Sequence, residues 1–241
     1  MTELQRKLSD WPLSWITREQ LKKIVSKLIV EATPKTKDLS YKNVVDPFSA
    51  LFDMAVTGLT YESWIEAEIR RQHQKTLQNA IGKFHQSVLG SVDGWEDKGV
   101  GEQFDLLCPS RKIFAEVKNK FNTVKASDKS NLYDNMTRWR GIDSEHKQYT
   151  GYYVQILTKA KFDRPFVPSD NKTGNKVAVN PHIREIDGVS FYTLVTGSST
   201  ALQDLYGIFP YVLESVCHEF DAEKAVNHEK FLNFYNLAFN P

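Results

Sequence analysis

Apolar positions along the chain change repeatedly between helical and strand spacing, and this pattern predicts a mixed α/β protein. The segments with helical spacing are 17–31, 47–56, 61–89, 127–139, 199–213 and 221–238. Shorter apolar or alternating runs predict strands at 92–95, 151–157 and 190–196, with a β-hairpin inside 104–123. The order of these elements predicts a mixed central β-sheet flanked by helices.

Residues that cap helices support several of these boundaries. Thr17-Arg-Glu-Gln20 has the spacing of a capping box, in which each outer side chain bonds the backbone of the other residue. Asp46-Pro47 suits an N-cap followed by the first helical turn, and Thr60 and Asp221 precede the long helix and the last helix. The chain before residue 60 shows positions for packing or for a dimer surface, and no chemistry.

The long helix over 61–89 carries a polar stripe beside its apolar stripe. The polar positions lie four or seven residues apart and are Glu68, Gln72, Asn79 and Gln86. Such a stripe is ordinarily a solvated flank. The functional alternative is that one member reaches a metal site, and Glu68 is the candidate. Alternatively, Arg70, Arg71 and Lys75 on the same helix are candidates for phosphate contacts.

The hairpin is the stretch whose pattern indicates chemistry. If Ser110-Arg111 forms its loop, Leu107 lies opposite Phe114 and Asp105 lies opposite Glu116. Strand alternation places Lys118 on the same face as Glu116, while Ile113, Ala115 and Val117 point to the other face. Two carboxylates and an ammonium group therefore converge at one end of the hairpin.

Two interpretations of this charge cluster remain open from the hairpin alone. Carboxylates so close repel each other unless a cation lies between them, and hard oxygen ligands suit Mg²⁺, so a metal-dependent nuclease is one interpretation. A surface hairpin with a cross-strand charge cluster is the other. The same spacing recurs at Asp134, Glu145 and Lys147, but without a β-branched run and with a glycine in between.

Composition is that of one globular domain, and charge is distributed unevenly along it. The 241 residues are 41% hydrophobic and 25% charged, with a net charge of +1. Segments 111–129 and 159–184 each hold six Lys/Arg against two Asp/Glu, whereas 185–241 holds two against eight. The basic segments indicate a footprint for a polyanion such as nucleic acid, although lysines also simply solvate loops.

Other common classes of protein have no pattern in this chain. Cys108 and Cys217 form no disulfide framework or zinc motif, and the histidines lack metal-ligand spacing. No glycine-rich loop precedes a helix with a phosphate-binding lysine. No apolar run reaches the length of a membrane span, and the first residues show no apolar signal region, so we expect a cytoplasmic protein.

Longer strings of sequence resemble a known family. The chain is similar to the SinI group of type II restriction endonucleases over about residues 43–211. The strings that carry this resemblance are Ile-Gly-Lys-Phe-His-Gln-Ser-Val-Leu-Gly (81–90), Phe-Asp (104–105) and Ile-Phe-Ala-Glu-Val-Lys-Asn-Lys-Phe-Asn-Thr (113–123). That group belongs to the PD-(D/E)XK nuclease superfamily and cuts double-stranded GGNCC or GGWCC sites. The resemblance implies that Asp105 and Glu116 bind metal and that Lys118 is the catalytic lysine. Phe104 stands where the superfamily motif has proline.

The resemblance implies a Mg²⁺-dependent endonuclease with the restriction-endonuclease-like fold, acting on double-stranded DNA as a homodimer. The products would carry a 5′-phosphate and a 3′-hydroxyl. We expect one nuclease domain over 1–241, with an N-terminal helical part (1–60), a catalytic core (61–217) and a C-terminal helix (218–241). The alternatives are a repair or junction-resolving nuclease with the same hairpin, a non-catalytic DNA-binding protein, and a structural protein that binds no DNA.

Residues near the hairpin and in the second basic segment are candidates for DNA contacts. Lys120, Asn122 and Lys125 follow the catalytic strand and are expected to meet phosphates near the scissile bond. Arg164 and Arg184 are expected to read bases, because the guanidinium group matches the two acceptors of guanine. The segment 159–184 is otherwise a mobile loop, and base reading would then lie elsewhere, for example in 127–147.

Overall fold

The computed structural model describes residues 8–33, 45–99, 101–121, 124–141, 144–217, 219–221 and 228–239. The chain divides into two compact units: residues 27–83 form one, and residues 1–26 with 84–241 form the other. Helices near both boundaries contribute to both units. The single nuclease domain over 1–241 stays a prediction.

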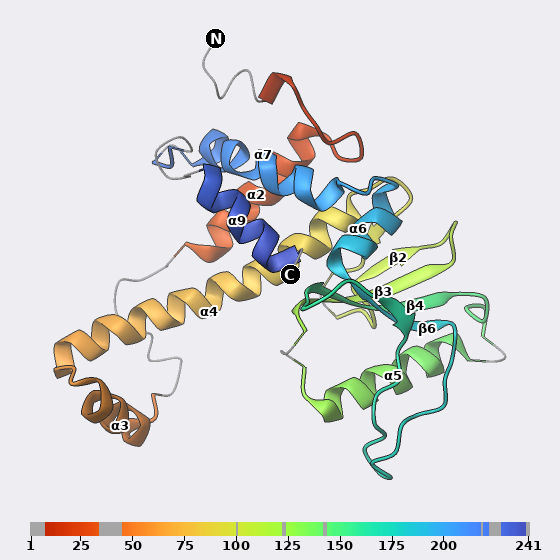
Figure 1. Cartoon of the computed structure of the whole chain (residues 1–241), viewed down its shortest axis with the longest axis horizontal. Helices are drawn as coiled ribbons and strands as arrows, with labels where there is room; N and C mark the ends of the chain where they lie inside the picture. The colour runs from red at the N-terminus through yellow and green to blue at the C-terminus, as the bar shows by residue number, and fades with distance from the viewer. Residues whose placement is uncertain are drawn as a thin grey trace. The chain divides into compact units, whose positions relative to one another are not determined.

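The observed elements confirm a mixed α/β protein (Figure 1). In chain order they are α2 (Arg18–Ala32), α3 (Pro47–Thr57), α4 (Tyr61–Gly90), β1 (Glu96–Asp97), β2 (Leu106–Cys108), β3 (Ile113–Lys120), α5 (Ala126–Arg140), β4 (Thr150–Leu157), β5 (Asp163–Pro165), β6 (Ile183–Asp187), α6 (Gly188–Thr196), α7 (Ala201–Val216) and α9 (His228–Phe239). Among the described helices, none combines the length and apolar character that a membrane span requires.

A six-stranded mixed sheet forms the centre of the larger unit, in the order β1-β2-β3-β4-β6-β5. The first three strands form an antiparallel meander, which short turns can connect. Strands β3, β4 and β6 are parallel, so α5 serves as the crossover between β3 and β4. Strand β5 pairs antiparallel at the far edge. Figure 1 shows α5 on one side of the sheet and α6 on the other.

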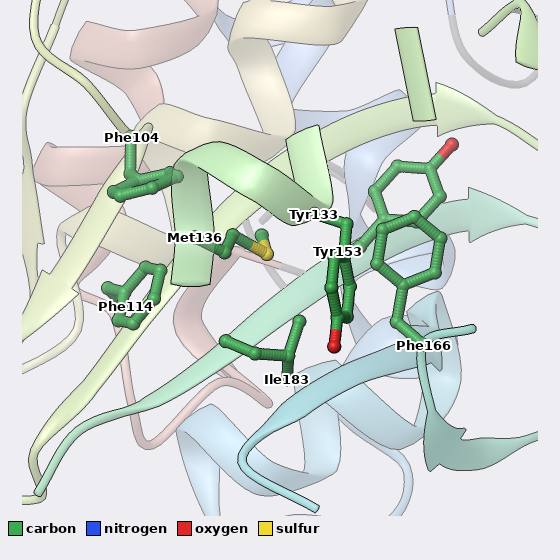
Figure 2. Close-up of a cluster of buried hydrophobic side chains, with 7 residues drawn as sticks. All are labelled: Phe104, Phe114, Tyr133, Met136, Tyr153, Phe166 and Ile183. Carbon is green, nitrogen blue, oxygen red and sulfur yellow. The ribbon is translucent and has the colours of Figure 1, made fainter. Parts of the chain in front are cut away.

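The core on the α5 side is built from large aromatic side chains (Figure 2). Phe114 of β3, Tyr153 of β4 and Ile183 of β6 pack against Tyr133 and Met136 of α5. Burial of each such side chain contributes roughly 1.5–3 kcal/mol. A glycine in β4 makes room for this packing, because a Cβ at residue 151 would stand 2.4 Å from the Phe114 ring.

Three of the four predicted helix caps, at Thr17, Asp46 and Thr60, are confirmed by hydrogen bonds. The Thr17 backbone N–H donates to Gln20 Oε1 at 2.8 Å, and the Gln20 N–H donates to Thr17 Oγ1 at 3.2 Å, so the capping box exists. Asp46 Oδ1 accepts from the Phe48 N–H at 3.0 Å. Thr60 Oγ1 accepts from the Ser63 N–H at 3.3 Å. These interactions are local in sequence, which is why the sequence reveals them.

Three predictions of secondary structure need correction. The strand predicted at 190–196 is helix α6, because Asp187 accepts from the Ser190 N–H at 3.0 Å as an N-cap. Its β-branched and aromatic residues reflect burial rather than strand geometry. Residues 92–95 form turns, and the strand begins at Glu96. The segment 159–184, predicted as a loop, contains β5 and the start of β6.

Helix α9 runs over His228–Phe239, and residues 222–227, which follow the predicted cap Asp221, lie outside the described residues.

Candidate active site

The register of the hairpin brings the predicted charged residues together. Leu107 pairs with Phe114 and Leu106 pairs with Ala115, which continues to Asp105 opposite Glu116. The turn closes through a hydrogen bond from the Lys112 N–H to the Pro109 carbonyl at 3.1 Å. The predicted register is therefore confirmed. The second copy of the spacing begins on α5, at Asp134, and lies on no strand.

Hydrogen bonds hold the two ends of the charge cluster. Asp105 Oδ2 accepts from the Val117 backbone N–H at 2.7 Å, which ties the carboxylate to the neighbouring strand. Lys118 Nζ lies 2.5 Å from Glu116 Oε1. The side chains of Glu116 and Lys118 are 18% and 37% exposed, so a ligand from solvent can reach them. Asp105, Glu116 and Lys118 thus form one cluster on the hairpin.

Burial makes it unfavourable for Asp105 and Glu116 both to be ionised unless a cation lies beside them. Burial raises the pKa of Asp105, and the charge of Asp97 adds to that effect, against the Val117 hydrogen bond and the Lys118 charge. Burial and the Asp105 charge likewise raise the pKa of Glu116. Burial alone would lower the pKa of Lys118, but the charge and hydrogen bond of Glu116 outweigh it and raise that pKa.

The donor set fits a hard divalent cation. The Asp105 carboxylate accepts one backbone hydrogen bond, from Val117 to Oδ2, and Glu116 supplies a second carboxylate. Within the described residues, no group of three or more His, Cys, Asp or Glu side chains is placed to hold a metal. Mg²⁺ is commonly held by one or two carboxylates with waters and substrate phosphates in the other positions, so two carboxylates suffice.

Polar residues of the next strands continue this face of the sheet, and sequence reasoning missed most of them. Tyr153 and Glu185 lie in register with Glu116 across β4 and β6. Gln155, in register with Lys118, is 4% exposed and donates to Glu185 Oε2 at 3.4 Å. The Tyr153 hydroxyl is buried and has no hydrogen-bond partner among the described residues. The only sequence signal was that Gln155 is polar within an apolar strand.

Comparison with known proteins shows which family the chain belongs to. The sequence matches the model of the Eco47II restriction endonuclease family over residues 13–218. The chain belongs to the Eco47II restriction endonuclease family. It is 39% identical to the type II restriction enzyme Eco47II of Escherichia coli, over 94% of this chain and 98% of that protein. It is 29% identical to the type II restriction enzyme Sau96I of Staphylococcus aureus, over 94% of this chain and 89% of that protein.

The predicted resemblance to type II restriction endonucleases is therefore confirmed. The chain is an enzyme of the type II site-specific deoxyribonuclease class. Its six-stranded mixed sheet with flanking helices is consistent with the predicted restriction-endonuclease-like fold.

In this Eco47II family member, Glu68 lies in the unit formed by residues 27–83. Its side chain is 7% exposed, and both of its oxygens accept from Arg71 at 2.6 Å. Gln72 Nε2 also donates to Glu68 Oε1 at 3.0 Å. The hydrogen bond from Arg71 lowers the pKa of Glu68, so the carboxylate stays charged. A role for Glu68 at the metal stays a prediction.

The DNA-contact candidates occupy two places in the larger unit of this family member. Lys120 ends β3 and Lys125 precedes α5, and both are exposed, while Asn122 lies outside the described residues. Arg164 Nε donates to Glu185 Oε1 at 2.7 Å, and Arg184 Nε donates to Asp163 Oδ1 at 2.7 Å. The two arginines therefore lie at the β5–β6 edge, already paired with carboxylates.

Proposed function

We propose that this enzyme hydrolyses phosphodiester bonds of double-stranded DNA with Mg²⁺ at a short, palindromic GGNCC-like site. The products carry a 5′-phosphate and a 3′-hydroxyl. One observation carries the proposal: Asp105 and Glu116 oppose each other on the hairpin, and Lys118 lies 2.5 Å from Glu116. Membership of the Eco47II family supports the reaction class.

Each residue of the cluster has a distinct role in this proposal. Asp105 and Glu116 hold the ion, which when bound supplies positive charge to the scissile phosphate and its leaving oxygen. Lys118 orients the attacking water and neutralises charge that develops on the phosphate. Because the pKa of Lys118 is raised, its amine is charged at neutral pH. A charged amine suits charge neutralisation better than proton abstraction.

Glu68 is proposed as an assisting carboxylate for the same ion. Its support is the pair of Arg71 hydrogen bonds, which keep Glu68 charged. A Glu68→Gln variant that cuts at an unchanged rate with unchanged metal dependence would remove it from the site.

The DNA contacts are proposed in two groups. Lys120, Asn122 and Lys125 bind phosphates beside the scissile bond, since they directly follow the catalytic strand. Arg164 and Arg184 read base edges. Each arginine must first leave a carboxylate, and Arg164 can do so more easily because it is 64% exposed and its partner Glu185 keeps the hydrogen bond from Gln155.

A homodimer acting in the cytoplasm is proposed, because a palindromic site matches two subunits related by a two-fold axis, each cutting one strand. Helix α3 offers a surface on which to test this. Phe48, Leu51, Phe52 and Val56 recur at helical spacing and are 63–84% exposed. Sedimentation of the wild type and of a Phe52→Lys variant checks whether this surface joins two copies.

Digestion of plasmid DNA of known sequence tests the proposed function. With Mg²⁺ we expect discrete bands, whose ends give the site, and with a chelator we expect none. Cleavage that follows DNA shape instead of sequence would indicate a junction-resolving or repair nuclease. Binding without cleavage would indicate a DNA-binding protein, and an absence of salt-dependent DNA binding would contradict both.

A further inference from the structure

The last turns of α4 lie against β1, where their polar side chains surround Asp97. Gln86 Nε2 donates to Asp97 Oδ1 at 2.8 Å, and Ser87 Oγ donates to Asp97 Oδ2 at 2.9 Å. The Gly99 N–H donates to Asp97 Oδ1 at 2.9 Å. The approach is close, since a Cβ at Gly90 would stand 2.6 Å from the Asp97 Cβ and backbone nitrogen. Asp97 is therefore held on several sides.

The same glutamine also reaches the first acid of the candidate active site. Gln86 Nε2 lies 3.3 Å from the Asp105 carbonyl oxygen, which also accepts from the Lys98 backbone N–H at 3.0 Å. One amide group thus joins the Asp97 side chain to the Asp105 main chain. Residues Gln86, Asp97 and Asp105 form a connected set, which we name the bracket.

The bracket matters because Asp105 lies outside the regular strand. Strand β2 begins at Leu106, and the Asp105 carbonyl just before it accepts from the Lys98 backbone N–H and from Gln86 Nε2, so these two contacts orient the Asp105 peptide. On its other side, the Asp105 carboxylate is held by the Val117 N–H at 2.7 Å. The bracket therefore contacts the Asp105 main chain, while Val117 holds one oxygen of its carboxylate.

We propose that Gln86 and Asp97 are positioning residues for Asp105, which orient its carboxylate toward the bound metal ion. This inference rests on the proposed function, in which Asp105 holds that ion. Gln86, the last member of the polar stripe on α4, acts on the site only through Asp105, whereas Glu68 is proposed to reach the ion itself. A glutamine is required because its amide donates to two oxygen acceptors, whereas methionine of similar length and glutamate, when ionised, donate to neither.

The test compares variants that break the bracket with a matched substitution on the same helix. Gln86→Met and Asp97→Ala remove the two halves, and Gln78→Met is the control, since Gln78 is exposed on α4. Asp97→Asn keeps an oxygen acceptor and serves as the conservative variant. For each protein, Mn²⁺ affinity is measured calorimetrically without DNA, and single-turnover cleavage is measured against Mg²⁺ concentration. Cognate DNA affinity without metal and the thermal midpoint complete the set.

We expect Gln86→Met and Asp97→Ala to weaken Mn²⁺ binding and cleavage by about 10- to 100-fold, the usual cost of losing a partner that orients a metal ligand. DNA affinity without metal should change less than about twofold, and Gln78→Met should match the wild type. The Gln86→Met/Asp97→Ala double variant should lose no more metal affinity and cleavage than the more impaired of the two single variants, because both substitutions break one set of bonds. Asp97→Asn should recover most of the activity.

Three results would overturn the inference. Gln86→Met with the metal affinity and cleavage of the wild type would show that the bracket does not act on Asp105. Losses that only follow a fall in thermal midpoint would show a structural role instead. A wild type that neither binds Mn²⁺ nor cleaves would refute the proposed function and the bracket with it. If the wild type cleaves DNA and Gln86→Met cleaves it equally well, the bracket is refuted and the proposed function stands.

Discussion

At the scale of the residue, the first prediction concerns substitution of the charged residues of the hairpin cluster. We predict that Asp105→Ala, Glu116→Ala and Lys118→Ala each reduce Mg²⁺-dependent cleavage by at least about 100-fold, because each removes a charge that acts on the phosphate or its metal. Single-turnover digestion measures this, and circular dichroism with DNA binding confirms folding. Asp134→Ala and Lys147→Ala, from the second copy of the spacing, are the matched controls. Wild-type cleavage by Lys118→Ala would contradict the assignment.

A second prediction at this scale concerns Tyr153. Its hydroxyl is buried without a partner among the described residues, while its ring packs against Phe166 with centroids 5.0 Å apart. A buried unpaired polar group costs about 1–3 kcal/mol, and phenylalanine keeps the ring. Tyr153→Phe should therefore raise the free energy of unfolding of the metal-free protein, as measured by denaturant titration. A lower value would mean that the hydroxyl has a stabilising partner, such as a water.

At the scale of the element, His85 joins the last turns of α4 to helix α6. Its Nδ1 lies 2.9 Å from the Tyr192 hydroxyl. Burial raises the pKa of Tyr192, so the hydroxyl remains protonated and can donate to a neutral imidazole. Burial lowers the pKa of His85 from 6.5 to about 4. Protonation of His85 would put a charge into this contact and remove the acceptor.

The pH dependence of stability follows from that lowered pKa. Between about pH 6.5 and about pH 4, the unfolded state binds the proton of His85 and the folded state does not. The contribution of His85 is therefore fully present above pH 6.5 and is lost as the pH falls, by at most about 1.4 kcal/mol per pH unit. Denaturant titrations across this range should show a steeper fall for the wild type than for His85→Gln. Parallel curves would contradict the prediction.

At the scale of the whole molecule, binding of DNA should show which basic residues meet phosphates and which read bases. Lys120→Ala should weaken binding to all sequences and reduce the salt slope by about one. Arg164→Ala and Arg184→Ala should cost roughly 1–3 kcal/mol at the cognate site and much less on random DNA. Fluorescence anisotropy at several salt concentrations separates these outcomes. An unchanged slope for Lys120→Ala would leave it a surface residue, and equal losses on both DNAs would move base reading away from the arginines.

The sequence by itself determined the features that depend on neighbours along the chain. A turn at Pro109–Lys112 and strand alternation were sufficient to predict Asp105 opposite Glu116, because a hairpin sets its own register. The capping box at Thr17–Gln20 was visible for the same reason. The α/β class followed from the order of the elements, and the longer sequence strings indicated the family of nucleases.

Only the tertiary structure decided the features that depend on distant segments. Residues 190–196 have strand-like composition, yet Asp187 caps them as a helix and the core buries them on that helix. Glu185 lies in register with Glu116 only because β6 pairs with β4 and β4 pairs with β3. Of the polar stripe on α4, Gln86 contacts Asp105 because the end of the helix meets β1, a contact that spacing along one helix cannot reveal. Hydrogen bonds between residues close in sequence can be predicted from a short stretch of sequence, whereas contacts between distant segments form only when the whole sheet is assembled.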